Sequence, residues 1–376
     1  MWSLNAQELL LCKLMSPNTD EKMLPETDDF LHFAQRNEVD ALVGHFLLNS
    51  GTEQNVWKMA HQRVASYMRD YLAELDEIAA RMSRDGISIV ALKNGGIARG
   101  IYPCPGCCPM GDLDTLVEKR HFRRAHQVML EMGFHFEFRS PLEEAELQAA
   151  ENEGGAEYWK RLPNGEKMWF ELQWRAVAGR WIRPDQEPND EELMGRSIAI
   201  PGTDVRLLAP EDNLLQVCLH TAKHSYVRAP GFRLHLDVER IVRAYPEMDW
   251  DIFTQRVKVL QVKTPVYFSL LIPHDLFETP VPATVLDSLR PAAWKEKLII
   301  WWLGRVGLFN PDQPKFGRLG YVIFTSLLYD DPGGLLRGIF PSPIWMMEKY
   351  SFSNKLLLPF YYLRRLLELT FHRVNT

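Results

Sequence analysis

The chain has 376 residues, of which 46% are hydrophobic and 24% charged, and its formal net charge is -6 at pH 7. This composition is typical of a globular protein with a substantial core, and the negative charge argues against electrostatic binding of long nucleic acid. Five cysteines without a disulfide-type framework, no cleavable signal and no apolar run of membrane-spanning length favour a cytoplasmic protein.

The first 80 residues are expected to form a helical segment. Apolar side chains recur there at helical spacing, most clearly at Val64, Tyr67, Met68, Tyr71 and Leu72. From residue 81 the pattern changes to short apolar runs separated by turns, which indicates a small α/β unit.

Residues 87–92 form a short apolar run and predict a buried strand. Lys93, Asn94, Gly95 and Gly96 follow, and the glycine pair predicts a turn at which backbone N–H groups can approach a phosphate closely. Lys93 could bind phosphate as a point charge or only solubilise the turn. A short helix is expected from 97 to about 102.

Residues 112–117 predict a second strand that carries two acids. Because side chains alternate along a strand, Asp112 and Asp114 face the same side, while Leu113 and Val117 can pack into the core. Two aspartates held side by side on a strand can share divalent metal ions that bind phosphate oxygens.

Further elements follow the acid pair in chain order. We expect a helix over 122–132 that ends at Gly133, a strand at 134–138 and an acidic insertion at 140–155 that could form a helix. A strand at 167–175 places Glu171 on the same face as Trp169 and Gln173. Glu171 is thus a third acid within one small unit.

These residues together resemble the polymerase-beta-like nucleotidyltransferase superfamily. More narrowly, the chain is similar to an uncharacterised bacterial nucleotidyltransferase family. The matching motifs are Leu92-Lys93, Tyr102-Pro103, Pro109-Met110-Gly111-Asp112-Leu113-Asp114-Thr115-Leu116-Val117, Glu171-Leu172-Gln173-Trp174, Leu219-His220 with His224, and Asp237. The resemblance implies an α+β fold. Its core, a small mixed sheet with helices, would span 81–208, between helical segments at 1–80 and 209–376.

The resemblance also implies a reaction and its residues. A nucleotidyl group would pass from a nucleoside triphosphate to an acceptor, which could be a small molecule, a peptide or a protein. Asp112, Asp114 and Glu171 would be catalytic and hold Mg²⁺ or Mn²⁺. The nucleotide would be bound by Lys93, Asn94, Gly95, Gly96, His220 and His224.

The chain departs from the family pattern at three positions. Asn94 replaces a glycine, Cys108 replaces an arginine and Gln173 replaces a histidine. Because a guanidinium can bind a triphosphate with its planar fork and a thiol cannot, we expect weak nucleotide binding. On the expectation that this loop faces the phosphates, Cys108→Arg should tighten that binding.

Cys104 and Cys107 stand beside Cys108 in the loop before the acid strand. A zinc site needs four thiolate or imidazole ligands, and the two remaining cysteines, Cys12 and Cys218, are far away in sequence. The sequence therefore argues against a metal site in this loop.

A helix that begins at Pro210 carries His220 and His224 four residues apart, which is metal-ligand spacing. The two histidines could line the cleft, bind Asp237 across helices or simply pack. One alternative function is a metal-dependent hydrolase that uses His220, His224 and Asp237. Another is a non-catalytic binding or scaffold module on the same fold.

Residues 355–373 combine a leucine-rich face with Arg364, Arg365 and Arg373. A basic amphipathic helix of this kind could lie on a membrane surface. Packing on its own domain or on a partner subunit is the favoured interpretation.

Overall fold

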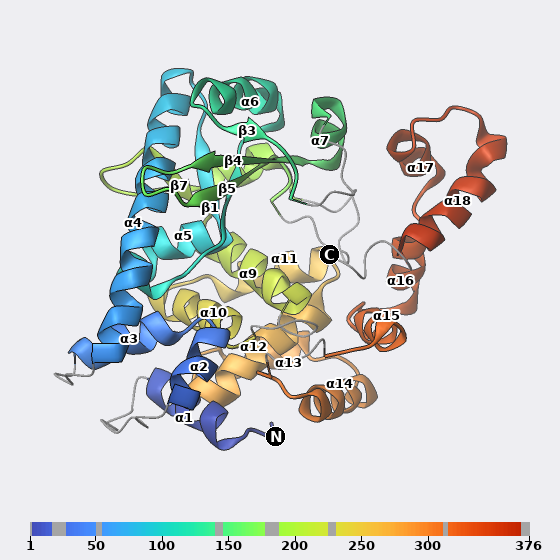
Figure 1. The fold of residues 1–376 in the computed structure, drawn as a ribbon. Coiled ribbons are helices and arrows are strands. Elements are labelled where there is room, and N and C mark those ends of the chain that lie inside the picture. The colour runs from blue at the N-terminus through green and yellow to red at the C-terminus, as the bar shows by residue number, and fades with distance from the viewer. Residues whose placement is uncertain are drawn as a thin grey trace.

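The protein contains a seven-stranded mixed sheet with flanking helices, in the upper part of the molecule as drawn (Figure 1). The computed structural model describes residues 2–16, 28–49, 55–139, 146–176, 188–224, 231–310 and 315–369. The strands are β1 (Ile89–Leu92), β2 (Asp112–Leu116), β3 (His135–Phe136), β4 (Gly155–Arg161), β5 (Lys167–Gln173), β6 (Ile198–Ala199) and β7 (Val205–Leu207). The expected α+β fold with a mixed sheet is thus confirmed.

The strand order is β3-β4-β5-β2-β1-β7-β6, so β2 and β5 are neighbours in the middle of the sheet. They run parallel, whereas β1 is antiparallel to β2 and β4 is antiparallel to β5. Strand β1 also pairs in parallel with β7. The two strands that carry the acids therefore share one ladder.

Strand β4 was missed by the sequence analysis, which placed no element between residue 155 and the strand at 167. Ala156 and Tyr158 are buried on one face of β4, while Glu157 and Trp159 point to the other. This alternation is the period of a strand, but it extends over few residues and includes charged ones. The insertion before β4 contains the helix α7 (Leu147–Glu153), and residues 140–145 lie outside the described residues.

Helix α5 (Lys93–Gly100) begins directly after β1, where the sequence predicted a turn followed by a helix from 97. Gly95 and Gly96 lie inside this helix. A Cβ atom on Gly96 would meet the carbonyl oxygen of Ala91 at 2.7 Å, and one on Gly95 would meet Leu113 Cδ2 at 2.9 Å. The glycine pair thus lets α5 pack closely against β1 and β2.

The N-terminal part of the chain is helical, as expected. It contains α1 (Ala6–Met15), α2 (Asp28–Arg36), α3 (Asp40–Asn49) and α4 (Asn55–Arg84). Helix α4 runs along one side of the sheet and continues past residue 80, and it contacts α6 (Phe122–Glu131) and β7 (Figure 1). The division of the chain at 80 and at 208 remains a prediction.

The helices that follow the sheet form a second layer below it (Figure 1). They are α9 (Pro210–His224), α10 (Phe232–Ala244), α11 (Trp250–Val259), α12 (Lys263–Phe277), α13 (Ala283–Leu289) and α14 (Ala293–Val306). The short helix α8 (Asp190–Arg196) comes before the last two strands. Helices α9, α10 and α12 pack on one another, and α9 also contacts α5. This contact brings the helical layer to the edge of the sheet where β1 ends.

The C-terminal helices lie to one side of the molecule, and the first of them packs on α14 (Figure 1). They are α15 (Arg318–Leu327), α16 (Pro332–Ile339), α17 (Pro343–Lys349), the short 3₁₀ helix Lys355–Leu357 and α18 (Leu358–Leu367). Much of their apolar surface is exposed, for example at Leu356, Phe360 and Leu363, whereas Arg365 is buried. Among the residues described, no helix combines the length and the apolar character needed to cross a bilayer.

Candidate active site

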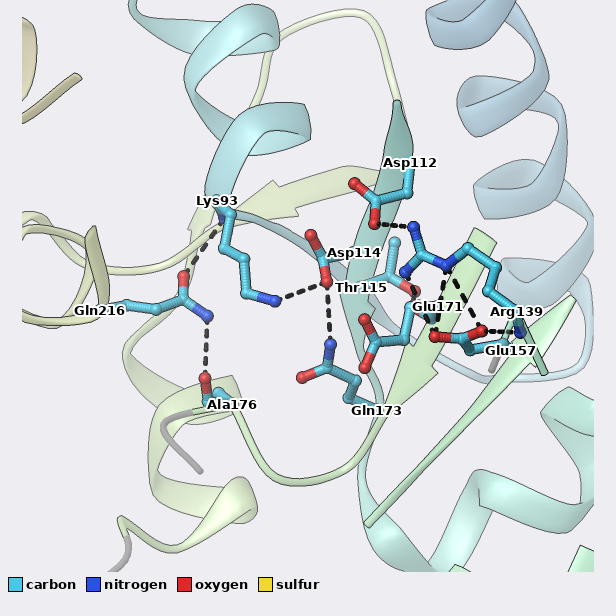
Figure 2. Close-up of polar contacts among 10 residues, drawn as sticks. All are labelled: Lys93, Asp112, Asp114, Thr115, Arg139, Glu157, Glu171, Gln173, Ala176 and Gln216. Atoms are coloured by element: carbon cyan, nitrogen blue, oxygen red, sulfur yellow. Dashed lines mark hydrogen bonds and ion pairs between the residues drawn. The ribbon is translucent and has the colours of Figure 1, made fainter. Parts of the chain in front are cut away.

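The three predicted acids come together on one face of the sheet. Asp114 of β2 and Glu171 of β5 are directly paired in the parallel ladder, and Asp112 lies two residues before Asp114 on the same side. One carboxylate oxygen from each of the three lies within 4.8 Å of the other two. Figure 2 shows the three carboxylates with a lysine on one side and an arginine on the other.

The alternation of the two strands explains this convergence. Leu113, Phe170 and Leu172 are buried on the opposite face, so the acids between them must point away from that core. The hydroxyl of Thr115 donates to the carbonyl of Glu171 over 3.1 Å and holds the two strands together (Figure 2). The acid positions are therefore set by a rigid part of the sheet.

Lys93 lies at the junction of β1 and α5. Its φ of 47° is in the left-handed region, which costs a non-glycine residue about 1–2 kcal/mol. Its ammonium lies 2.6 Å from Asp114 Oδ1, and its backbone N–H donates to Gln216 Oε1 over 3.3 Å. Gln216 Nε2 in turn donates to the carbonyl of Ala176 over 2.9 Å, just beyond β5 (Figure 2).

The charges around Lys93 decide its protonation and that of Asp114. Burial by itself lowers the pKa of Lys93, but Asp114 and Glu171 outweigh it and raise that pKa above its ordinary value. Burial likewise raises the pKa of Asp114, but the Lys93 charge outweighs it and the pKa ends below its ordinary value. Gln173 Nε2 also donates to Asp114 Oδ1 over 3.0 Å. Asp114 is thus ionised and held from two sides.

Arg139 is the cation on the other side of the acids. Its guanidinium lies 2.7 Å from Asp112 Oδ2 and 3.2 Å from Glu157 Oε1. Its backbone N–H also donates to Glu157 Oε2 over 2.6 Å. Burial and Asp114 raise the pKa of Asp112, and Arg139 only partly offsets them. Arg139, Glu157 and Gln216 were missed by the sequence analysis.

Glu171 has the most perturbed carboxyl of the three. Its burial, together with the neighbouring Asp114, raises the pKa to about 8, although Lys93 acts in the opposite direction. At neutral pH Glu171 therefore retains a proton unless a cation takes its place. Three oxygen ligands with excess negative charge fit a hard divalent cation such as Mg²⁺ or Mn²⁺.

Three of the residues predicted to bind nucleotide are buried in the structure. Asn94, Gly95 and Gly96 are buried, and Asn94 Oδ1 accepts a hydrogen bond from Arg233 Nη1 over 2.9 Å. The predicted turn is wrong, because Gly95 and Gly96 lie inside α5 and pack against the sheet, whereas phosphate binding by this segment stays a prediction. Lys93 is the first residue of α5, so the backbone N–H groups of Asn94 and Gly95 follow it directly at the start of the helix.

The loop that contains Cys108 does not present this side chain to the acids. Cys108 is fully buried, with its Sγ 3.8 Å from the carbonyl of Asn94 and 3.9 Å from Arg233 Nη1. The guanidinium of Arg233 is itself held by Asp237 Oδ2 at 3.0 Å and by Glu38 Oε2 at 2.7 Å. The expectation that this loop faces the phosphates is therefore wrong for Cys108.

His220 and His224 do not join Asp237. Their rings are neighbours on α9, 4.6 Å apart between centroids, and the charge of Lys93 adds to burial in holding the pKa of His220 well below its ordinary value. Asp237 instead accepts from Tyr102 Oη over 2.8 Å. Among the described residues these three bring no set of ligand atoms within 4.8 Å of one another. The hydrolase interpretation is thus not supported.

Comparison with known proteins agrees with the site. The sequence model of a family described as an uncharacterised nucleotidyltransferase matches residues 25–278, which include all seven strands and helix α9. The match covers more than half of the chain, so the protein belongs to this nucleotidyltransferase family. Membership supports a role in nucleotidyl transfer. No curated protein and no solved structure is significantly similar to the chain.

Proposed function

We propose that this protein transfers a nucleotidyl group from a nucleoside triphosphate to an acceptor, on a polymerase-beta-like core with two metal ions. The observation that carries the proposal is the cluster of Asp112, Asp114 and Glu171, whose carboxylate oxygens lie within 4.8 Å of one another on adjacent parallel strands. Lys93 supplies the nearest cation, 2.6 Å from Asp114.

Asp112, Asp114 and Glu171 would hold Mg²⁺ or Mn²⁺. When bound, the ions would neutralise charge on the transferred phosphoryl group and activate the acceptor oxygen. Asp112 and Asp114, fixed by Arg139 and Lys93, would orient the site before substrate arrives. Glu171, which is paired with Asp114 in the parallel ladder, would lose its proton when a cation binds and would take the acceptor proton at its carboxylate oxygen.

The nucleotide would lie at the N-terminal end of α5. Lys93 would exchange its contact with Asp114 for a phosphate oxygen, and the first N–H groups of the helix, at Asn94 and Gly95, would face the same phosphates. His220 is close enough to Lys93 for that charge to lower its pKa, so it would line the same region as a neutral imidazole. The contact of α5 with β2 supports these placements.

The acceptor would be a small molecule, a peptide or a protein. The net charge of -6 disfavours long nucleic acid. Within the described part of the chain, the basic side chains that form ion pairs with the two aspartates are Lys93 and Arg139. Two cations are too little positive surface to follow a polynucleotide backbone. The free thiols of the described residues fit the cytoplasmic location that we propose.

A pair of labelled nucleotides tests this function. The protein is incubated with Mg²⁺ and acceptor fractions, once with a nucleoside triphosphate labelled at the α-phosphate and once with label at the γ-phosphate. We expect α-label in an acceptor and γ-label only in released pyrophosphate. Asp112→Asn should abolish both signals, and Asp287→Asn, at a side chain 69% exposed on α13, should change neither. Transfer of the γ-label would indicate phosphoryl transfer instead.

A further inference from the structure

A second cluster of metal-ligating side chains lies away from the acids. His45 of α3, His61 of α4, and Cys104 and Cys107 at the two ends of the 3₁₀ helix η1 (Pro105–Cys107) each offer one ligand atom, and these four atoms lie within 4.8 Å of one another. The elements are distant in sequence, and η1 packs on both α3 and α4. The cluster thus joins the N-terminal helices to the loop before β2.

The distances from Cys104 to the two histidines match the edges of a zinc tetrahedron. Zn–S and Zn–N bonds of ~2.3 and ~2.05 Å give S···N edges of ~3.6 Å and an S···S edge of ~3.8 Å. Cys104 Sγ lies 3.7 Å from His45 Nδ1 and 3.6 Å from His61 Nε2. The sulfurs of Cys104 and Cys107 are 3.3 Å apart. This S···S distance is about 0.5 Å shorter than the ideal edge, and the ligand atoms of the remaining three pairs lie within 4.8 Å of one another.

The surroundings of the cluster orient its ligands. His61 Nδ1 lies 3.0 Å from the carbonyl oxygen of Ala41, which can only accept, so the proton is on Nδ1 and Nε2 faces Cys104 with a free lone pair. Metal-binding histidines are commonly held in this way by a backbone carbonyl. The second histidine ring, of His45, is 5.2 Å from that of His61 between centroids.

Gly106 allows the two cysteines to reach the helices. A Cβ atom at this position would lie 2.7 Å from Ala65 Cβ and 2.9 Å from His61 Cε1, closer than real Cβ contacts allow. Only glycine therefore allows the backbone between Cys104 and Cys107 to pack closely against α4. This close approach brings both sulfurs to the histidines.

The ligand set indicates which metal would bind and in what role. Sulfur and imidazole nitrogen ligands suit Zn²⁺ and not Mg²⁺ or Ca²⁺, and two thiolates would balance the charge of the ion. Four protein ligands leave no open position for a substrate, which is the arrangement of a structural site. Such a site would fix the loop that continues through the buried Cys108 to Asp112 of β2.

We propose that His45, His61, Cys104 and Cys107 bind one structural Zn²⁺, which fastens the loop before β2 to α3 and α4. The sequence argued against a metal site in this loop, because the other cysteines are far away and the two histidines were not considered as ligands. The zinc site is independent of the acid cluster and of the proposed reaction.

Metal analysis of the purified full chain tests the proposal. After expression with added zinc and dialysis under reducing conditions, we expect about one zinc per chain, and less than about a tenth of that in a Cys104→Ser/Cys107→Ser variant. Cys108→Ala, which removes the neighbouring thiol outside the cluster, is the matched control and should retain the metal. Loss of zinc from the control alone, or equal zinc in all three proteins, would overturn the assignment.

If the double variant does not fold, Co²⁺ binding to the wild-type protein tests the same site. Refilling the stripped protein with Co²⁺ should give the visible bands of tetrahedral coordination and a thiolate-to-metal charge-transfer band, and Zn²⁺ should displace both. Wild-type protein that contains no zinc, gives no Co²⁺ bands or holds Cys104 and Cys107 in a disulfide under these conditions would refute the site.

Discussion

Replacing Glu171 by glutamine should stabilise the protein when no divalent cation is present. The carboxyl of Glu171 lies within 4.8 Å of those of Asp112 and Asp114. At an effective dielectric constant of about 20, two ionised carboxylates at this separation repel each other by about 3.5 kcal/mol. An amide of the same shape removes the charge and keeps the packing, so Glu171→Gln relieves this repulsion.

The pKa of Glu171 determines which of the two proteins is the more stable and over which pH range. Burial and Asp114 raise the pKa of Glu171 from 4.5 to about 8, so between these values the folded protein takes up a proton that the unfolded chain does not bind. The wild type therefore loses stability, relative to Glu171→Gln, by up to about 1.4 kcal/mol per pH unit as the pH rises from 4.5 to 8. Above pH 8 the difference should stay constant.

Urea unfolding in a chelating buffer at pH 5, 6, 7 and 8 measures this difference. We expect the two proteins to be alike at pH 5 and Glu171→Gln to be more stable by no more than about 3 kcal/mol at pH 7. Mg²⁺ should then stabilise the wild type, by about 2.7 kcal/mol at a hundred times its dissociation constant, and the variant much less. A variant that is less stable than the wild type at pH 8, or equal stabilisation of both by Mg²⁺, would refute the reasoning.

Three further substitutions test other parts of the account. Lys93→Met leaves the buried Asp114 without its cation, and should lower the free energy of unfolding by about 3 kcal/mol in urea titrations; unchanged stability would show that the pair is not coupled. Gly96→Ala forces a Cβ atom to 2.7 Å from a carbonyl oxygen of β1, and should cost more than about 1 kcal/mol, whereas Gly195→Ala on α8, with open space around it, should be neutral or slightly stabilising. Cys108→Arg places a second guanidinium in a fully buried position beside that of α10, so calorimetry should show a lowered melting temperature and no tighter nucleotide binding. A tenfold gain in nucleotide affinity would contradict this last prediction.

The acids could be predicted from the sequence because their placement is local. Alternation along a strand puts Asp112 and Asp114 on one face wherever that strand lies. Glu171 could be expected on a strand of the same unit, but its direct pairing with Asp114 depends on the strand order. The sequence of a single strand does not contain this order.

The remaining residues of the site depend on contacts between distant segments. Arg139 is held by Glu157 of β4, the strand that the sequence analysis missed, and Gln216 reaches Lys93 from helix α9. A glycine pair after a strand is compatible with a turn and with a close-packed helix. In the structure the pair lies in a helix, packed against the side chain of Leu113 and the carbonyl of Ala91, two contacts that the local sequence does not reveal.

The histidine–cysteine cluster likewise depends on contacts between segments that are distant in sequence. Cys104 and Cys107 have a recognisable spacing, but their partners are on helices about 40 and 60 residues earlier. His45 and His61 carry no motif that would connect them to the loop. The packing of η1 on α3 and α4 makes that connection.

Counting bound Mn²⁺ by electron paramagnetic resonance tests the central claim most directly. The wild type, titrated with Mn²⁺ in the presence of a nonhydrolysable nucleoside triphosphate, should bind two ions per chain in addition to those on free nucleotide. Asp112→Asn and Glu171→Gln should each lose at least one of them, while Asp287→Asn binds as the wild type does. Nucleotide that binds equally well with and without Mn²⁺, or ion binding that neither acid substitution changes, would contradict a metal-dependent nucleotidyltransferase site at these acids.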